Sequence, residues 1–342
     1  MRIGLLFGGK SFEHDISIIT SNVVYHALKE KHEVHLLYID KKGDFKKPSK
    51  LVIENFVNEQ KFHSFNFVKN GIKIGCKYIK LDVIIGAMHG LNGEDGLSAS
   101  IADLYDIPYV GCNRITSGVL MDKYFTYAIL RINGIETIHT NYYLSNDNIF
   151  VRKYPVIVKP ARLGSSIGIS KVNNNDEFLT KINKAFMFDN KIIIQPFIER
   201  FKEYNQAAYF FNGDIVVSKV EEVFKSSEIL SFDDKYITTK TGAKHSFVFD
   251  GDIIDKISGV TKKIYNLFEM SGIVRIDYML IGDRLYVNEI NTTPGSLSFY
   301  LFDDEILVLL EKQIHTALLK YQNRNDNVFK SSVLNQKYSY KK

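Results

Sequence analysis

Apolar and polar residues alternate over about the first 110 positions in a pattern that predicts strands and helices in turn. The apolar run at residues 3–7 ends at Gly8 and Gly9, which predicts a buried parallel strand followed by a turn. Strands are predicted at residues 3–7, 32–39 and 81–87, and helices at residues 16–28 and 97–105. Because strand and helix alternate, we expect a parallel α/β domain at the N-terminus.

Strand signals outnumber helix signals in the rest of the chain. Residues 151–159 and 164–171 are expected to be two extended pieces that flank a turn rich in glycine and serine. Strand-rich stretches are predicted at residues 192–222 and 272–291, and helices at residues 122–132, 253–270 and 304–319. Residues 323–342 are polar and lack periodicity, so we expect them to be frayed or disordered.

The size and charge of the chain exclude some classes of protein. With 342 residues, 45% of them hydrophobic, the chain suits two or three domains that share an α/β design. Its formal net charge of +5 equals that of residues 320–342, which contain six basic residues and one acidic residue. The rest of the chain is neutral, and we therefore expect no nucleic-acid partner.

Cysteine usage and the N-terminal sequence bear on the location of the protein. The spacing of Cys76 and Cys112 matches no metal or redox motif, so we expect each to be a small buried apolar residue. No run approaches the ~20 apolar residues of a membrane span, and the N-terminus shows no leader with a cleavage site. We therefore expect a cytoplasmic protein with no membrane contact.

Residues 4–11 match the phosphate-loop pattern of NTPases letter by letter, with Lys10 at the lysine position. A phosphate loop needs exposed backbone amides between its glycines, so this segment would have to leave the sheet. Residues 5–7, however, complete the first apolar strand. We expect the match to be accidental. The alternative, a phosphate-loop NTPase, predicts that Lys10→Ala abolishes nucleotide binding and that Lys159→Ala does not.

Residues 158–168 combine a strand, a lysine and a turn with two glycines and two serines. Lys159 next to this turn would let a cation and backbone amides close over a triphosphate. A β-hairpin with a solvated lysine explains the same residues, and this stretch alone does not decide between the two interpretations.

A second polar cluster favours the nucleotide site. It lies on two predicted strands, residues 274–281 and 285–292, where Arg275 shares a face with Asp277 and Glu289 shares one with Asn291. Carboxylate and amide oxygens brought together in this way are ligands that Mg²⁺ prefers. The other interpretation is an exposed polar hairpin, in which the acidic residues would prefer lysine partners, and this stretch contains no lysine.

The geometry of this hairpin is a prediction in itself. Because Asp277 and Glu289 have to share a face, we expect an odd-numbered loop at residues 282–284 that pairs Asp277 with Glu289. A two-residue turn would turn Glu289 to the other face. The predicted apolar face consists of Ile276, Tyr278, Leu280, Tyr286 and Ile290.

Five blocks of sequence resemble, in the same order, the motif set of D-alanine–D-alanine ligases, which belong to the ATP-grasp superfamily. The blocks are residues 8–17, 89–96, 121–123, 158–168 and 288–295. The resemblance implies an α/β ATP-grasp fold of three domains with ATP held between two sheet-containing domains. The implied regions are an N-terminal parallel α/β domain (1–115), a central subdomain (116–195), a C-terminal Mg²⁺-binding domain (196–322) with an ω-loop (223–250), and the polar tail (323–342).

The resemblance also implies an activity. Two D-alanine molecules would be joined at the expense of ATP through an acyl phosphate, which releases ADP and phosphate and yields a peptidoglycan precursor. Dimers are common in the family, so a homodimer is an open expectation. A paralogue that joins D-alanine or another amino acid to a different second amino acid is the alternative.

The resemblance also assigns roles to individual residues of the site. ATP would be bound by Lys123, Lys159, Ser165, Ser166, Gln195, Glu203 and Lys235, with Gln195 at the adenine edge and Glu203 at the ribose. Asp277, Glu289 and Asn291 would hold Mg²⁺, as two ions, with Mn²⁺ as a substitute. Glu13 would receive the ammonium group of the first substrate, with His89 close by.

The remaining implied roles concern the chemical step. Arg275 and the amide of Gly295 would stabilise the oxyanion. Tyr236 of the ω-loop would form hydrogen bonds toward Glu13 and Ser165, and its presence favours an amine nucleophile over a hydroxyl.

Two features depart from the family pattern. Tyr300 stands where the family has a serine that binds the carboxylate of the second substrate. Residues 238–242 replace a shorter link in the ω-loop. The departures leave the second substrate open. A regulatory protein that has lost catalysis is a third class of function, which the full set of metal ligands and the Lys235-Tyr236 pair argue against.

Overall fold

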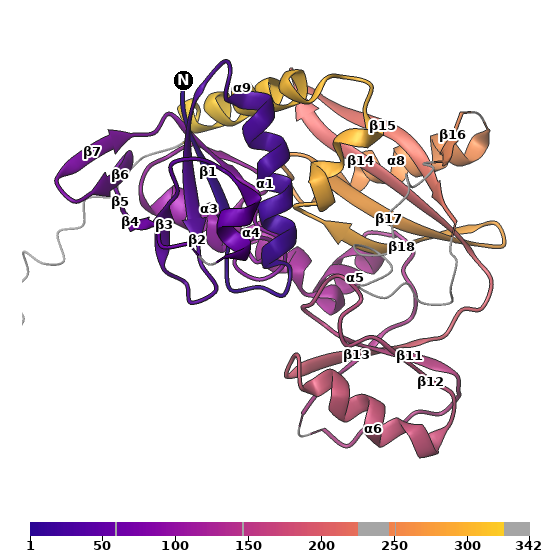
Figure 1. Cartoon of the computed structure of the whole chain (residues 1–342). Helices are drawn as coiled ribbons and strands as arrows, with labels where there is room; N and C mark the ends of the chain where they lie inside the picture. Colours follow the sequence, from indigo (N-terminus) through magenta and orange to yellow (C-terminus); the bar gives the residue numbers. More distant parts are fainter. Residues whose placement is uncertain (59, 146, 225–245, 250, 325–342) are drawn as a thin grey trace, which may run out of the picture.

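The computed structural model describes residues 1–58, 60–145, 147–224, 246–249 and 251–324. The N-terminal region forms a six-stranded sheet of order β4-β3-β2-β1-β8-β9, shown in indigo and violet in Figure 1. Four of its strands are parallel: β1 (Arg2–Gly8), β2 (Glu33–Ile39), β8 (Val83–Gly86) and β9 (Tyr109–Val110). Helices α1 (His14–Leu28), α2 (Ile53–Val57) and α3 (Leu97–Leu104) belong to this region. The predicted parallel α/β core is therefore confirmed.

The sequence did not predict the antiparallel part of this region. Strands β3 (Phe45–Lys47) and β4 (His63–Ser64) extend the parallel sheet in antiparallel pairing. Strands β5 (Asn66–Val68), β6 (Gly71–Ile74) and β7 (Lys77–Lys80) form a separate three-stranded sheet. Cys76 lies in the turn between β6 and β7 and is exposed, so the expectation that it is buried was wrong, whereas Cys112 is buried.

The phosphate-loop match is contradicted by the first strand. Leu5, Leu6 and Phe7 lie inside β1 and are fully buried. Lys10 is exposed after the strand ends. The segment therefore forms part of the sheet and offers no cradle of free amides.

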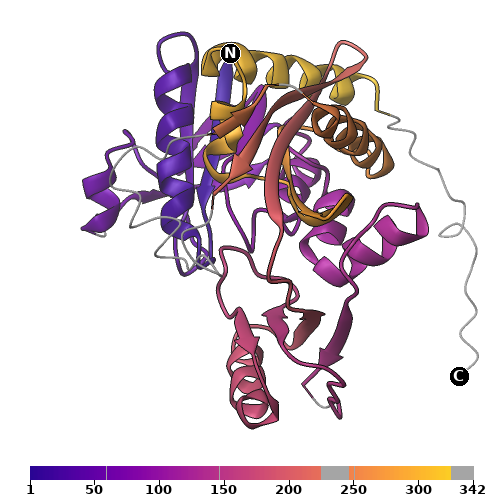
Figure 2. The same ribbon diagram turned by 90° about the vertical axis from the view of Figure 1, so that its right-hand side faces the viewer.

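The central region is a small antiparallel sheet covered by one helix. Figures 1 and 2 show it standing apart below the rest of the molecule. Its strands are β10 (Asn141–Leu144), β13 (Lys191–Pro196), β11 (Val156–Pro160) and β12 (Ser170–Val172), in that order across the sheet, and its helix is α6 (Asn175–Phe186). Helices α4 (Arg114–Met121) and α5 (Lys123–Ile132) precede it. The extended pieces are shorter than expected, since β11 begins at Val156 and the turn between the two strands takes up residues 161–169.

The C-terminal region contains a five-stranded antiparallel sheet of order β16-β15-β14-β17-β18. Its elements are β14 (Lys202–Phe211), β15 (Asp214–Val223), β16 (Ser246–Val248), α8 (Asp252–Leu267), β17 (Val274–Ile281), β18 (Arg284–Asn291), the 3₁₀ segment η1 (Gly295–Leu301) and α9 (Ile306–Gln322). Leu309 and Ile314 of α9 share a core with Ile3 and Leu5 of β1, so α9 packs on the N-terminal sheet.

The β17–β18 hairpin corrects one prediction and confirms another. Ile281 pairs with Arg284, so the turn has two residues and the expected three-residue loop was wrong. Asp277 nevertheless pairs with Glu289, because the register shifts at a bulge where Asn288 is the extra residue. The bulge also changes which residues of β18 face the core.

The apolar face of the hairpin reflects this bulge. Leu285, Val287 and Ile290 are buried in one core cluster with Ile276 and Tyr278 of the partner strand. Tyr286 was predicted for this face but pairs with Met279 and lies outside that cluster. The shorter turn places Leu285 and Val287 on the core side in place of Tyr286, and the extra residue Asn288 then inverts the alternation, so that Ile290 faces the core as predicted.

Candidate functional site

A cavity of about 360 Å³ lies where residues from the N-terminal, central and C-terminal regions meet. A second cavity of about 170 Å³ adjoins it and shares Lys123, Ser165 and Glu289 with it. The predicted site residues Glu13, His89, Lys123, Ser165, Glu203, Arg275, Asp277, Glu289, Asn291, Gly295 and Tyr300 line the first cavity, and Lys159, Ser166 and Gln195 line the second. Lys235 and Tyr236 lie outside the described residues.

Glu13 and His89 form the N-terminal side of the larger cavity. Glu13 lies at the start of α1, and its carboxylate accepts a hydrogen bond from the Ser165 hydroxyl of the turn after β11. His89 Nδ1 lies 2.8 Å from the Thr293 carbonyl oxygen, and Nε2 lies 2.8 Å from Thr20 Oγ1. Burial lowers the pKa of His89 to about 4, so the ring is neutral at pH 7.

Glu94 is a carboxylate that sequence reasoning missed. It lines the larger cavity, and one of its oxygens lies 4.0 Å from His89 Nδ1. Burial raises its pKa well above the usual range, and the nearby carboxylates of Glu13 and Glu289 add to the shift. Glu94 belongs to the motif at residues 89–96, but nothing in one sequence indicated that it would face the same space as Glu13 and Glu289.

Lys123 connects the central region to the C-terminal sheet. It is the first residue of α5, and its ammonium donates a hydrogen bond to the Leu163 carbonyl at 2.8 Å. The same nitrogen lies 2.9 Å from Glu289 Oε1. The hairpin therefore does have a lysine partner, supplied by a distant segment.

Asp277 and Asn291 lie beside each other on the polar face of the hairpin. The Arg275 guanidinium donates two hydrogen bonds to the Asp277 carboxylate, at 2.7 and 2.9 Å. Asn291 Nδ2 donates to Asp277 Oδ2 at 3.2 Å. Two carboxylates and an amide, from Asp277, Glu289 and Asn291, thus gather at one place on paired strands.

The smaller cavity has apolar walls and a few polar groups. Ile138, Phe197 and Met279 line it together with Lys159, which is buried at the end of β11. Gln195 Nε2 donates to Thr140 Oγ1 at 2.8 Å. A flat apolar group with polar edges would suit this cavity.

Tyr300 and Glu221 also line the larger cavity. The Tyr300 hydroxyl donates to Glu221 Oε2 at 2.9 Å, and Asn205 Nδ2 donates to the same oxygen at 3.2 Å. Burial raises the pKa of Tyr300, so the phenol is neutral at pH 7. Sequence reasoning missed Glu221, because one carboxylate on a strand has no distinguishing pattern.

The fold and the site define the class of the protein as ATP-grasp, with the smaller cavity between the central and C-terminal regions and a larger cavity that the N-terminal region also lines. The fold is that of a D-alanine–D-alanine ligase from Helicobacter pylori, with a TM-score of 0.79 and 29% identity over 92% of this chain and 98% of that one. The ligase from Coxiella burnetii shares the fold with a TM-score of 0.81 at 23% identity, over 94% of this chain and 96% of that one.

Sequence comparison specifies the family. Residues 2–112 match the family model described as D-ala D-ala ligase N-terminus, and residues 126–306 match the model of its C-terminus. A D-alanine–D-alanine ligase from Thermosipho melanesiensis is 35% identical over 350 aligned positions, which cover 95% of each chain. The chain belongs to the D-alanine–D-alanine ligase family and is an enzyme of the ligase class.

One further finding concerns membranes. Among the helices of the described residues, none is both long and apolar enough to cross a bilayer.

Proposed function

We propose that the protein joins two D-alanine molecules in an ATP-dependent reaction that proceeds through an acyl phosphate and supplies a precursor of peptidoglycan in the cytoplasm. The observation that supports this most is the convergence of Glu13, Lys123, Arg275 and Gly295 on one cavity, although they come from four separate segments of the chain. Family membership supports the same activity.

The smaller cavity suits the nucleotide. Its apolar walls would hold the adenine, with Gln195 at the polar edge and Glu203 at the ribose, since Glu203 lines both cavities. Lys159 and Lys123 would bind the phosphates, and Ser165 and Ser166 lie in the turn that would cover them. This arrangement would direct the γ-phosphate into the larger cavity.

Residues Asp277, Glu289 and Asn291 suit Mg²⁺, because their donor atoms are hard oxygens and lie together on one face. The ion, when bound, would neutralise charge on the phosphate oxygens. In this structure Lys123 and Arg275 neutralise the two carboxylates instead. These contacts, which hold one carboxylate on each of the two paired strands, support the proposal that the pair would bind the ion.

The first D-alanine would bind through its ammonium group to Glu13, next to the neutral His89. Its carboxylate oxygen would attack the γ-phosphorus, release ADP and become an acyl phosphate. The amine of the second D-alanine would then attack the acyl carbon, lose a proton and expel phosphate. Arg275 and the Gly295 amide would stabilise the negative oxygen that forms between these steps.

We also propose three functional regions, residues 1–115, 116–195 and 196–322, with residues 223–250 as an ω-loop that brings Lys235 to the γ-phosphate and Tyr236 toward Glu13 and Ser165. The six-stranded sheet of the first region, the four-stranded sheet of the second and the five-stranded sheet of the third support this division.

Amino-acid-dependent phosphate release from ATP tests the proposal. D- and L-amino acids would be supplied singly and in pairs, with product dipeptides identified by mass spectrometry. D-Alanine alone should support both phosphate release and dipeptide formation. Release with no amino acid, or dipeptide formation only from a pair without D-alanine, would contradict the proposal. A panel that favours D-alanine followed by another amino acid would identify the paralogue instead.

A further inference from the structure

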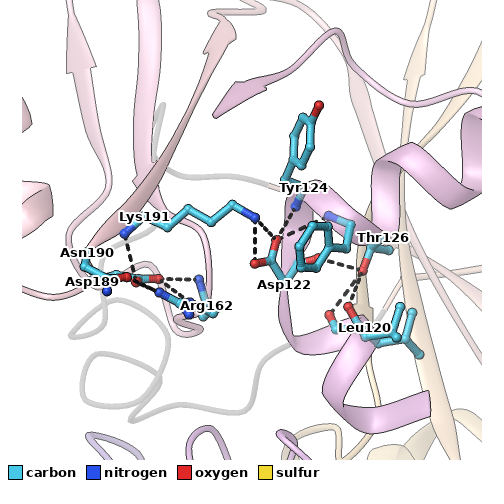
Figure 3. Close-up of polar contacts among 10 residues, drawn as sticks. Leu120, Asp122, Tyr124, Thr126, Arg162, Asp189, Asn190 and Lys191 are labelled. Carbon is cyan, nitrogen blue, oxygen red and sulfur yellow. Dashed lines mark hydrogen bonds and ion pairs between the residues drawn. The ribbon is translucent and has the colours of Figure 1, made fainter. Parts of the chain in front are cut away.

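A buried ion pair lies outside the two cavities, immediately before the first residue of α5. Lys191 Nζ lies 2.8 and 3.0 Å from the carboxylate oxygens of Asp122, as Figure 3 shows. The two side chains are only 8% and 6% exposed. The rings of Tyr124, Phe125 and Tyr142 surround the ammonium, with the Phe125 centroid at 3.9 Å. Desolvation offsets much of the attraction in such a pair, so stability alone is a weak reason for it.

The pair belongs to a closed ring of contacts around Lys123. Asp122 caps α5, because its Oδ1 accepts the backbone N–H groups of Tyr124 and Phe125 at 3.0 and 3.2 Å. The Lys123 N–H donates to the Ala161 carbonyl at 3.0 Å, and the Ala161 N–H donates to the Lys191 carbonyl at 2.9 Å. Lys191 thus holds Lys123 from two sides, through the Asp122 side chain and through the Ala161 backbone.

The same strand start also fixes the entry to the glycine- and serine-rich turn. The Lys191 N–H donates to Asp189 Oδ1 at 3.1 Å, and the Arg162 N–H donates to Asp189 Oδ2 at 2.9 Å. Figure 3 shows the Arg162 side chain directed at the same carboxylate. At the next residue, the Leu163 carbonyl accepts a hydrogen bond from the Lys123 ammonium. The positions of the turn and of Lys123 therefore depend on one anchoring point, the first residue of β13.

We propose that Lys191 and Asp122 are positioning residues, which set the place of the Lys123 ammonium between the Leu163 carbonyl and Glu289. The inference rests on the proposed function, in which Lys123 binds the phosphates of ATP. Neither residue lines either cavity, so they act on ATP only through Lys123 and the turn that begins at Arg162. The contact of Lys191 Nζ with both carboxylate oxygens fixes the orientation of the Asp122 side chain. Because this side chain caps α5, the contact also fixes the first turn of the helix.

The test is a double-mutant cycle on ATP affinity, measured by calorimetry with ATP and Mg²⁺ in the absence of amino acids. One arm is Asp122→Asn combined with Lys191→Met, which removes both charges, keeps a capping oxygen and keeps the apolar stem. Because uncharged replacements of buried pairs are often neutral for stability, this variant should melt near the wild-type temperature. The other arm is Lys123→Met.

We expect the uncharged pair to weaken ATP binding by about tenfold in the wild-type background and by less than about twofold beside Lys123→Met, because residues that share a contact are non-additive. A control replacement of the ion pair between Lys312 of α9 and Asp304, which precedes this helix, should leave ATP affinity unchanged when it is made as Asp304→Asn with Lys312→Met. If the double variant does not fold, Lys191→Arg, which keeps the charge but changes the geometry of the contact with Asp122, takes its place in the cycle and should again weaken ATP binding only beside the native Lys123.

Equal weakening in both backgrounds would overturn the inference, because it would indicate general loosening of the region. Unchanged ATP affinity in the uncharged variant, with a clear loss in Lys123→Met, would overturn the inference and leave the proposed function standing. Unchanged ATP affinity in Lys123→Met would overturn the inference together with the role of Lys123 in the proposed function, since Lys123 would then not bind ATP.

Discussion

The ammonium nitrogen of Lys123 lies 2.9 Å from Glu289 Oε1 and so joins the start of α5 to the last residues of β18. The neighbouring Asp277 carboxylate is held by Arg275 at 2.7 Å. Both proposed metal-ligating carboxylates are therefore neutralised by cations that line the same cavity. Four charged groups that balance in this way keep the two acidic side chains side by side on the hairpin.

Asp277→Asn or Glu289→Gln should abolish ligation while the protein stays folded. Each substitution keeps the size of the side chain and the apolar face of the hairpin, but it weakens the Mg²⁺ site, and we expect dipeptide formation to fall by at least about 100-fold. Dipeptide yield at saturating Mg²⁺, with the melting temperature, measures both effects. Asp283→Asn, in the exposed turn of the same hairpin, is the matched control and should remain active. Undiminished turnover in either variant would disprove the metal assignment.

His89 should make the stability of the protein depend on pH. The unfolded state takes up a proton on this histidine near its usual pKa of 6.5, whereas the folded state resists protonation until about pH 4. The free energy of unfolding should therefore fall as the pH drops through this interval, by about 2 kcal/mol between pH 7.5 and 5 from His89 alone.

Urea unfolding of the wild type and of His89→Gln at both pH values measures this contribution. The stability difference between the two proteins should shift in favour of the variant at pH 5. His139→Gln, which changes an exposed histidine, should keep the pH dependence of the wild type. The prediction would be wrong if His89→Gln kept it as well.

Tyr300 should limit the size of the second amino acid. Its side chain lines the larger cavity and its hydroxyl is bound to Glu221, which restrains the ring. Large side chains should be rejected and D-alanine, D-serine or glycine accepted, because overpacking a rigid pocket costs ~1–3 kcal/mol. Tyr300→Ser should widen acceptance without changing ATP affinity.

Competition between D-alanine and bulkier D-amino acids as second substrate measures this preference. Tyr300→Phe is the control, because it keeps the ring and removes only the hydroxyl, and it should retain the size limit. A wild-type preference for a bulky second amino acid, or an unchanged preference in Tyr300→Ser, would show that this residue does not set the limit.

Lys159→Ala and Lys10→Ala should separate the two nucleotide-binding interpretations. Lys159 is buried and lines the smaller cavity, so its loss should weaken ATP binding by about tenfold or more, as expected for a charge-assisted contact. Lys10 is exposed beyond β1, and its loss should have no effect. Calorimetric titration with ATP measures both variants. Loss of ATP binding in Lys10→Ala with unchanged binding in Lys159→Ala would support the phosphate-loop interpretation instead.

The sequence by itself determined the parallel core, the polar hairpin and the residue types of the site. Buried strands such as β1 are visible in sequence because burial on both faces requires an unbroken apolar run. The pairing of Asp277 with Glu289 was also correct, because two polar faces on adjacent strands have to lie on the same side. The hairpin turn was wrong, since one bulge residue compensates for a shorter turn and leaves no mark in the alternation.

Only the tertiary structure decided which distant charges meet. Glu94, Glu221 and the cation beside Glu289 come from segments far apart in sequence, and a single carboxylate has no periodicity that would indicate its partner. The same holds for Lys191 and Asp122, whose pairing depends on how β13 lies against the start of α5. Local patterns determine secondary structure because they act through neighbouring residues, whereas the charges of the site are matched by packing between segments far apart in the sequence.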